Sequence, residues 1–281
     1  MSAEDAVNHI QSGNRVVVAH ACGEPSYLLD VMVANAKAYK DVEIVHMVAM
    51  GKAEYCKPEY AENFRHNAFF VGGTSRDAIA EGRGDFTPSF FFEVPRQFSS
   101  TMPVDVAMVM VTPPDENGMC SLGVSVDYTL EAVKQAKLVI AQVNPQMPWT
   151  GPYSLVSVKD LDCIVEHEAP IIELKPPKIG DIEKAIGEHC ASLVPDGHPP
   201  VGHRRHPRRR APLPQAQEGP GIHSEMFSDG VVELAEAGVI TNAKKTLHPG
   251  KFEVAFLMGT RRLYDFVDHN PRRGAAPCGL C

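Results

Sequence analysis

Two observations predict an α/β fold for this chain. Short runs rich in valine and isoleucine alternate with amphipathic segments, which is the pattern of strands alternating with helices. The apolar runs are short enough to be strands buried on both faces of a sheet. The chain has 281 residues, 44% hydrophobic and 22% charged, which suggests about two domains and excludes a disordered or collagen-like chain.

The predicted elements of the first domain follow the same patterns. The chain opens with a helix at Ala3–Gln11. A helix at Tyr27–Ala38 follows Pro25 and Ser26, which are typical of a helix start, and a helix at Arg76–Glu81 follows residues that can cap its first turn. The predicted strands are Val16–Ala19, Val42–Met47, Phe69–Val71, Val104–Val111, Leu138–Val143 and Cys163–Val165.

A second, shorter α/β unit follows. The stretch Ile182–Leu193 has apolar residues at the spacing of one helical face, and the first domain is expected to end after it, near Pro195. About 60 residues remain after Gly221. A domain of this size buries too little surface to be stable alone, so a truncated second domain is expected. The further predicted elements are a helix at Val231–Ala237, capped by Ser228 or Asp229 and stopped by Gly238, a strand at Glu253–Met258 and a helix at Arg261–Val267. The predicted organisation is therefore 1–196 as a complete N-terminal domain, 197–220 as an anomalous segment, 221–270 as the start of the second domain and 271–281 as an aberrant tail.

Composition limits the partners and the compartment. The 27 basic and 35 acidic residues give a net charge of −8, so neither nucleic acid nor an anionic membrane is an expected partner. The first residues lack the apolar core of a signal peptide, and no window reaches the roughly 18 apolar residues of a spanning helix. Seven scattered cysteines suit reduced thiols better than a disulfide framework, so the protein is expected in the cytoplasm. No histidines have metal-ligand spacing, and the lone pair Cys278 and Cys281 is poor evidence for zinc, so no metal is expected.

The segment His198–Pro220 differs from the rest of the chain. It reads HPPVGHRRHPRRRAPLPQAQEGP, with five arginines, three histidines and prolines that forbid regular structure. Three interpretations are open: a solvated basic linker, an arginine patch for phosphate or RNA, and a stretch translated in the wrong reading frame.

The genetic code favours the third interpretation. Codons permitted for this segment can be read one base later as TLQSGIGGIPDAVL, which has the pattern of a strand, a glycine-rich turn and a helix start. Such a turn offers backbone N–H groups to a phosphate or an oxyanion. The tail Pro271–Cys281 can likewise be encoded so that a neighbouring frame reads AVELRPVDYV, which resembles a strand. Local signals that agree with the fold at both places support a frameshift.

Three long motifs resemble family I CoA-transferases. They are GGTSRDAIAEGRGDFTPSFFFEVP at Gly72–Pro95, PVDVAMVMVTPPDENGMCSLGVSVDY at Pro103–Tyr128 and GIHSEMFSDGVVELAEAGVITN at Gly221–Asn242. The resemblance is to the acetyl-CoA hydrolase/transferase group, in the branch of the 4-hydroxybutyrate and butyryl-CoA:acetate CoA-transferases. It covers Arg15–Asp196 and Gly221–Asn270 and implies a homo-oligomer of two-domain subunits with a cleft between the domains.

The resemblance also implies a mechanism. The catalytic glutamate of the family's H-[ST]-E-M motif falls on Glu225. In the family this carboxylate attacks the acyl-CoA thioester and forms an acyl-glutamyl anhydride. The anhydride is converted to a glutamyl-CoA thioester, and an incoming carboxylate then carries out the same exchange in reverse. Coenzyme A is then a substrate, as acyl-CoA, and no cofactor is bound permanently. From the residues alone, Glu225 is an exposed glutamate in a loop just ahead of a helix start at Ser228, whose dipole could keep the carboxylate ionised.

Further site residues are expected on the same basis. The family's CoA-binding loop, G-I-G-x-I, should fall at positions 202–206, where only Gly202 matches. Gly23, Glu24 and Pro25 form a loop that borders the cleft in the family. Trp149 stands where relatives commonly have arginine, and the family's later G-G-Q-x-D-F segment is absent from the chain. Loss of an oxyanion donor costs about 10²- to 10³-fold in rate, so weak activity is expected of the chain as written.

Two other functions are open. An acyl-CoA hydrolase would resolve the glutamyl thioester with water in place of a carboxylate. An inactive scaffold would use the basic run Arg204–Arg210 as an arm for a polyanion, although no stacking aromatics accompany that run.

Overall fold

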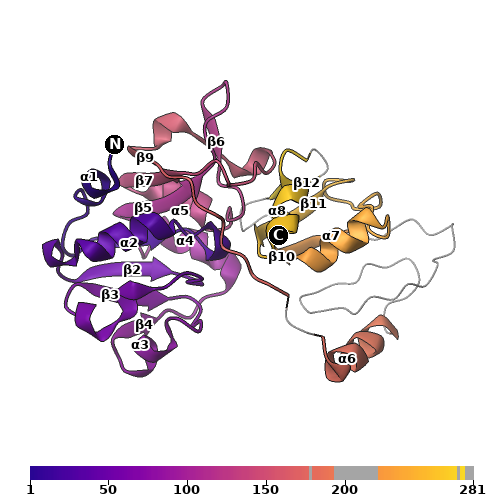
Figure 1. Cartoon of the computed structure of the whole chain (residues 1–281), viewed down its shortest axis with the longest axis horizontal. Coiled ribbons are helices and arrows are strands. Elements are labelled where there is room, and N and C mark those ends of the chain that lie inside the picture. Colours follow the sequence, from indigo (N-terminus) through magenta and orange to yellow (C-terminus); the bar gives the residue numbers. More distant parts are fainter. Residues whose placement is uncertain (177–178, 193–220, 271–272, 276–281) are drawn as a thin grey trace.

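Seven parallel strands form the larger sheet of the computed structural model, which describes residues 1–176, 179–192, 221–270 and 273–275 (Figure 1). The strand order is β4-β3-β2-β1-β5-β7-β9. The chain builds outward from β1 on one side and then returns to β5 on the other, so the order reverses between β1 and β5. Ligands of open α/β sheets bind at the carboxyl ends of the strands at such a reversal. The strands of this sheet are β1 (Arg15–Val18), β2 (Val42–His46), β3 (Phe64–Ala68), β4 (Gly84–Phe86), β5 (Val106–Val111), β7 (Leu138–Val143) and β9 (Cys163–Glu166).

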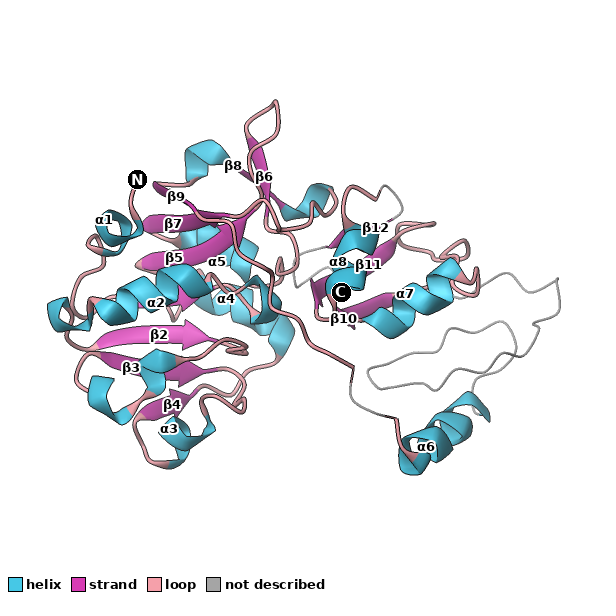
Figure 2. Ribbon diagram, in the orientation of Figure 1, coloured by secondary structure: helices cyan, strands magenta, loops and turns pink. Residues whose placement is uncertain are grey.

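Burial on both faces explains the valine-rich strands. In β1, Val16 and Val18 pack into one hydrophobic cluster and Val17 packs into another, and all three are buried. The first cluster contains α1 (Ala3–Val7) and α2 (Ser26–Ala34), and Figure 2 shows α2 crossing the near face of the sheet. The second cluster contains residues of α4 (Val94–Phe98) and α5 (Thr129–Gln135). The sheet is therefore the middle of three layers, and α3 (Arg76–Ala80) lies beside β4.

A smaller parallel sheet, in the order β10-β11-β12, forms the second unit. The arrow of β2 in Figure 2 points toward the side on which this unit lies. An antiparallel pair, β6 (Met119–Ser121) with β8 (Leu155–Ser157), projects from the larger unit. The elements of the second unit are β10 (His223–Phe227), α7 (Asp229–Glu236), β11 (Phe252–Leu257), α8 (Arg261–Val267) and β12 (Arg273–Ala275).

The predicted α/β class is confirmed, and several bounds agree closely. The strand at Leu138–Val143 and the helix at Arg261–Val267 match β7 and α8 residue for residue. The predicted first two helices are shorter in the structure, and Tyr27–Ala38 divides into α2 and a 3-10 turn at Ala36–Ala38. Gly238 does end α7, because it takes a positive φ of 71°.

The strand predicted at Phe69–Val71 is wrong. The strand is β3, Phe64–Ala68, which pairs with β2 and buries Phe64, His66 and Ala68. Its sequence, FRHNA, is too polar to be recognised as a buried strand, and Phe70 after it is 59% exposed. Five short strands were not predicted: β4, β6, β8, β10 and β12.

The region between the two units contains α6 (Asp181–Ser192), which matches the predicted helix. Ile182 and Ile186 of its apolar face are exposed, and Figure 1 shows α6 apart from the helices that cover the larger sheet. The predicted domain limit near Pro195 and the anomalous segment lie outside the described residues. The predicted tail does contribute β12, which pairs in parallel with β11.

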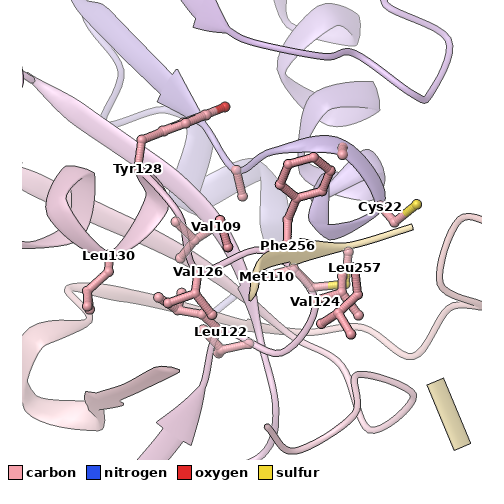
Figure 3. Packing of buried hydrophobic residues seen from close by; sticks show 14 of the residues in the cluster. Cys22, Val109, Met110, Leu122, Val124, Val126, Tyr128, Leu130, Phe256 and Leu257 are labelled. Carbon is pink, nitrogen blue, oxygen red and sulfur yellow. The ribbon is translucent and has the colours of Figure 1, made fainter. Parts of the chain in front are cut away.

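One hydrophobic cluster is shared by the two units. Figure 3 shows Phe256 and Leu257 of β11 beside Val124 and Val126 of the larger unit. In the described parts of the chain, no helix has the length and apolar character needed to cross a membrane.

Candidate active site

The two units meet where β11 runs alongside residues 124–127. The N–H of Leu257 donates to the carbonyl of Val124 at 2.9 Å, and the N–H of Asp127 donates to the carbonyl of Ala255 at 3.2 Å. An isolated antiparallel bridge joins Ser125 and Phe256. The smaller sheet is thus hydrogen-bonded to the larger unit near the carboxyl ends of β1 and β5, where the strand order predicts a ligand site.

His20 lies at the centre of this junction. Its backbone N–H donates to Oγ of Ser125 at 3.0 Å, and its Nδ1 is 2.9 Å from Oδ2 of Asp127. The other carboxylate oxygen of Asp127 accepts from the backbone N–H groups of Tyr128 and Thr129. Buried polar groups without partners are costly, and Nε2 of His20 has none among the described residues. This pair could not be predicted from the sequence, because His20 and Asp127 are 107 residues apart.

The predicted cleft loop, which contains Gly23, Glu24 and Pro25, follows His20 in the chain. Gly23 ends a 3-10 turn at Ala21–Gly23, and Pro25 occupies the position before α2. A Cβ atom on Gly23 would lie 2.5 Å from Cβ of Ser125, so only glycine fits this contact. The structure therefore brings Gly23, Glu24 and Pro25 together at the carboxyl end of β1, all three buried.

Glu24 has a buried carboxyl group that is 2% exposed. Its Oε2 accepts from the N–H of Gly51 at 3.0 Å, and its Oε1 accepts from the hydroxyl of Ser26 at 3.0 Å. Burial raises the pKa of Glu24, and these hydrogen bonds oppose that rise. Nε2 of His46 lies 3.9 Å from Oε2, while its Nδ1 is 3.0 Å from the hydroxyl of Tyr55.

A cavity of about 190 Å³ opens beside Glu24. Ser26 and Tyr55 also line it, and the rest of its wall comes from α2, from the loop after β2 and from Ile172. The sequence pointed to Glu24 through the loop motif. It did not indicate His46 and Tyr55, because these two residues come together only through contacts between β2 and the loop that follows it.

The predicted nucleophile, Glu225, lies on β10 in the second unit, so its predicted location in a loop is wrong. The strand forms because β10 pairs in parallel with β11, with Ser224 opposite Val254 and Met226 opposite Phe256. β10 is an edge strand of this sheet, and Glu225 is exposed. Because Glu225 is exposed, its carboxylate is open to solvent.

The helix start after Glu225 is organised by Asp229. Helix α7 begins at Asp229, with Ser228 before it making no side-chain cap. The carboxylate of Asp229 instead accepts from the N–H of Thr260 at 3.0 Å and from its hydroxyl at 2.6 Å. This contact ties the start of α7 to the start of α8.

Two further loops connect the units. Cys22, just before Gly23, is hydrogen-bonded to Tyr264 of α8 and to the backbone of Gly259, and burial raises the pKa of its thiol to about 11. The N–H of Trp149 donates to Oδ1 of Asp268 at 2.7 Å, and the carbonyl of Trp149 accepts from the N–H of His269 at 3.0 Å. The backbone of Trp149 therefore connects its loop to the residues that follow α8.

Gly202, the predicted CoA-contacting residue, lies outside the described residues. Among the residues that are described, no group of three or more histidine, cysteine or acidic side chains is placed to hold a metal ion.

The fold and the junction define a protein of two α/β units that meet at the carboxyl edge of a parallel sheet. Residues 1–175 match the family model of the acetyl-CoA hydrolase/transferase N-terminal domain, and the chain belongs to that family.

The relatives of this chain are CoA-transferases. The 4-hydroxybutyrate coenzyme A transferase of Clostridium kluyveri is 55% identical over 273 residues, which cover 96% of this chain and 64% of that protein. The butyryl-CoA:acetate CoA-transferase of Anaerostipes caccae is 29% identical over 98% of this chain and 64% of that protein. The crystal structure of 4-hydroxybutyrate CoA-transferase from Porphyromonas gingivalis superposes with a TM-score of 0.81 at 32% identity, over 99% of this chain and 67% of that one. The chain thus spans about two thirds of the length of these relatives.

Proposed function

We propose that the protein transfers coenzyme A between a short-chain acyl-CoA, 4-hydroxybutyryl-CoA or butyryl-CoA, and acetate or a similar carboxylate. The observation that carries the proposal is the position of Glu225, an accessible carboxylate in the second unit of a chain whose relatives carry out this class of reaction. A carboxylate suits the reaction because its anhydride and thioester are close enough in energy for reversible transfer.

The proposed steps involve no net uptake or release of a proton. An oxygen of Glu225 attacks the thioester carbon, the C–S bond breaks, and CoA leaves as a thiolate with an acyl-glutamyl anhydride remaining. The thiolate then attacks the glutamyl carbonyl and releases the acyl group as a carboxylate, leaving a glutamyl-CoA thioester. Attack by the second carboxylate reverses both steps, which predicts ping-pong kinetics.

The test is covalent trapping on Glu225. After incubation with butyryl-CoA, hydroxylamine should convert the Glu225 thioester to a hydroxamate that peptide mass spectrometry locates, and Glu225→Gln should abolish both the adduct and turnover. Glu236→Gln is the matched control, because Glu236 is an exposed carboxylate on α7 that pairs with Arg262. An adduct that persists in Glu225→Gln would disprove the assignment.

The second candidate is an acyl-CoA hydrolase, which the family description includes. The two differ in the group that resolves the thioester. Release of free CoA that does not depend on added acetate would favour the hydrolase, whereas formation of acetyl-CoA only with acetate would favour the transferase.

The reading frame bears on the activity expected. We propose that residues 198–220 and the tail from 271 arise from shifts of frame, in which case Gly202 is the remaining residue of the CoA-binding loop. Sequencing of the encoding DNA tests this directly. A restored frame should raise activity by at least about 10²-fold, the effect of regaining one oxyanion donor.

A homo-oligomer in the cytoplasm completes the proposal. Light scattering during gel filtration tests the first part, and a monomer at micromolar concentration would disprove it. Four cysteines in the part of the chain that the structure describes, Cys22, Cys56, Cys120 and Cys163, are buried and form no disulfide there, which is compatible with a reducing compartment.

A further inference from the structure

Tyr153, His248 and Glu253 form a hydroxyl–imidazole–carboxylate triad that the proposed function does not use. Tyr153 lies in the 3-10 turn Pro152–Ser154 of the larger unit, and its hydroxyl is 3.3 Å from Nε2 of His248. Nδ1 of His248 is hydrogen-bonded to Oε1 of Glu253 on β11. The rings of Tyr153 and His248 also stack, with centroids 5.5 Å apart and an interplanar angle of 26°. A tyrosine of one unit therefore meets a histidine–carboxylate pair of the other.

The carboxylate of Glu253 fixes the tautomer of His248. Because a carboxylate accepts, Nδ1 carries the proton and donates it, which leaves Nε2 able to accept one. Glu253 is 2% exposed, and its Oε2 has no partner among the described residues. A buried carboxylate is stabilised by a positive charge beside it. Glu253 therefore favours the imidazolium that forms when Nε2 takes up a proton.

The exposure of the three side chains decreases along the triad. Tyr153 is 41% exposed, and the side chains of His248 and Glu253 are 28% and 2% exposed. A nucleophile within reach of a base, with a third group that orients the base, is the arrangement used in nucleophilic catalysis. The pair of His20 and Asp127 differs, because both side chains are buried. The triad thus places its hydroxyl where a molecule from solvent can reach it.

The loop that carries His248 is held in one conformation. His248 has a φ of 48°, a strained conformation for a residue with a side chain, which persists only where the surrounding contacts enforce it. The N–H of Lys251 donates to the carbonyl of His248 at 3.1 Å. Nζ of Lys245 donates to the carbonyls of Ile222 and Lys251 at 2.8 and 2.7 Å. These contacts position the imidazole before any ligand arrives.

We propose that Tyr153 is an acyl-accepting site separate from Glu225 and takes the acyl group of an activated ester. His248 is its base, and Glu253 positions that base. Nε2 of His248 takes the hydroxyl proton while the tyrosine oxygen attacks the ester carbonyl. The bond between the carbonyl carbon and the leaving oxygen breaks, so a tyrosyl ester forms and the leaving group departs as an anion. The imidazolium then gives its proton to that anion or to solvent, which returns His248 to its neutral form.

The test uses p-nitrophenyl butyrate, whose leaving group is a weaker base than tyrosinate. Peptide mass spectrometry at neutral pH should find a butyryl ester on Tyr153, and Tyr153→Phe should remove it. Tyr27 is an internal control, because its ring stacks on His167 with centroids 3.7 Å apart, but no carboxylate is hydrogen-bonded to that imidazole in the described parts of the chain. Tyr153 should be acylated at least about 10²-fold faster than Tyr27, the usual gain from a positioned base. Equal rates for the two tyrosines would overturn the proposal.

Variants of the other two residues separate catalysis from structure. His248→Asn removes the base but tolerates the positive φ, and it should slow acylation of Tyr153 by at least about 10²-fold. Glu253→Leu should cause a similar loss, whereas Glu253→Gln, which still accepts from Nδ1, should retain more of the rate. Unaltered acylation in His248→Asn protein that is folded by circular dichroism would refute the assignment of the base. Glu225 lies on a different peptide, so the outcome at Tyr153 is read independently of the proposed transferase reaction.

Discussion

The imidazole ring of His20 packs edge-on against the phenyl ring of Phe256, with ring centroids 4.5 Å apart. His20 follows β1 at the centre of the larger sheet, and Phe256 lies on β11 in the second unit. Phe91 contacts both rings, at 5.9 Å from each. This aromatic contact, together with the hydrogen bonds of residues 124–127 to β11, makes the junction a continuous part of the hydrophobic core.

Phe256→Ala should therefore destabilise the protein by about 3–5 kcal/mol, the usual cost of removing a buried phenylalanine ring. Phe256 is 5% exposed, whereas Phe90 is 71% exposed, so Phe90→Ala is the control and should change stability by less than about 0.5 kcal/mol. Urea unfolding followed by circular dichroism measures both values. Equal losses in the two variants would show that Phe256 is not part of a packed junction.

Gly23→Ala tests the close approach of the cleft loop to the junction. The added methyl group would meet Cβ of Ser125 at 2.5 Å, so the loop must shift, which costs typically about 1–3 kcal/mol for overpacking. The same substitution at Gly72, where a Cβ would meet no atom within 4 Å, should have little effect on the melting temperature. A melting temperature for Gly23→Ala as high as that for Gly72→Ala would contradict the described contact.

Buried thiols should be unreactive in the folded protein. Burial raises the pKa of Cys56 to about 12 and the pKa values of Cys22 and Cys120 to about 11, so the thiolate that reacts with iodoacetamide is scarce at neutral pH. Pulse labelling followed by peptide mass spectrometry should find these three cysteines modified slowly under native conditions and rapidly in denaturant. Fast native labelling of Cys22 would mean that the junction opens readily.

Elements with a strong apolar pattern were predictable from the sequence, and those made by long-range pairing were not. The run LVIAQV predicts β7 correctly because it is buried on both faces. β3 was misplaced because the sequence FRHNA is polar, although its pairing with β2 buries His66 and Asn67. β10 was missed for a similar reason: its residues HSEMF become a strand only through pairing with β11.

The candidate site, like the fold, was predictable only where a local motif marks it. The loop Gly23–Pro25 was expected from a motif, and the structure places it at the reversal of the strand order. The partners of Glu24 were not expected, because Gly51 and His46 reach it from the neighbouring strand and loop. Spacing along a sequence carries no information about contacts of this kind, which depend on the tertiary fold.

Acid should destabilise the protein through its buried histidines. Burial lowers the pKa of His66 from 6.5 to about 4 and that of His46 well below 6.5. Between pH 6.5 and the lowered pKa of each histidine, the unfolded chain binds a proton that the folded chain does not. The folding stability therefore falls as the pH drops below 6.5, by up to about 1.4 kcal/mol per pH unit for each histidine. Glu24 acts in the opposite direction. Because its pKa is raised in the folded protein, its contribution to folding stability is largest at low pH and diminishes as the pH rises.

The contribution of His66 can be isolated with His66→Gln, which keeps a donor for the carbonyl of Ile44, 3.2 Å from Nδ1 of the histidine. Urea unfolding at a series of pH values between 6.5 and 4 should give a steeper loss of stability for the wild-type protein than for the variant. The difference arises because glutamine does not take up a proton in this range when the chain unfolds. Parallel curves for the two proteins would show that His66 titrates in the folded state as it does in the unfolded chain, and would contradict its burial between β2 and β4.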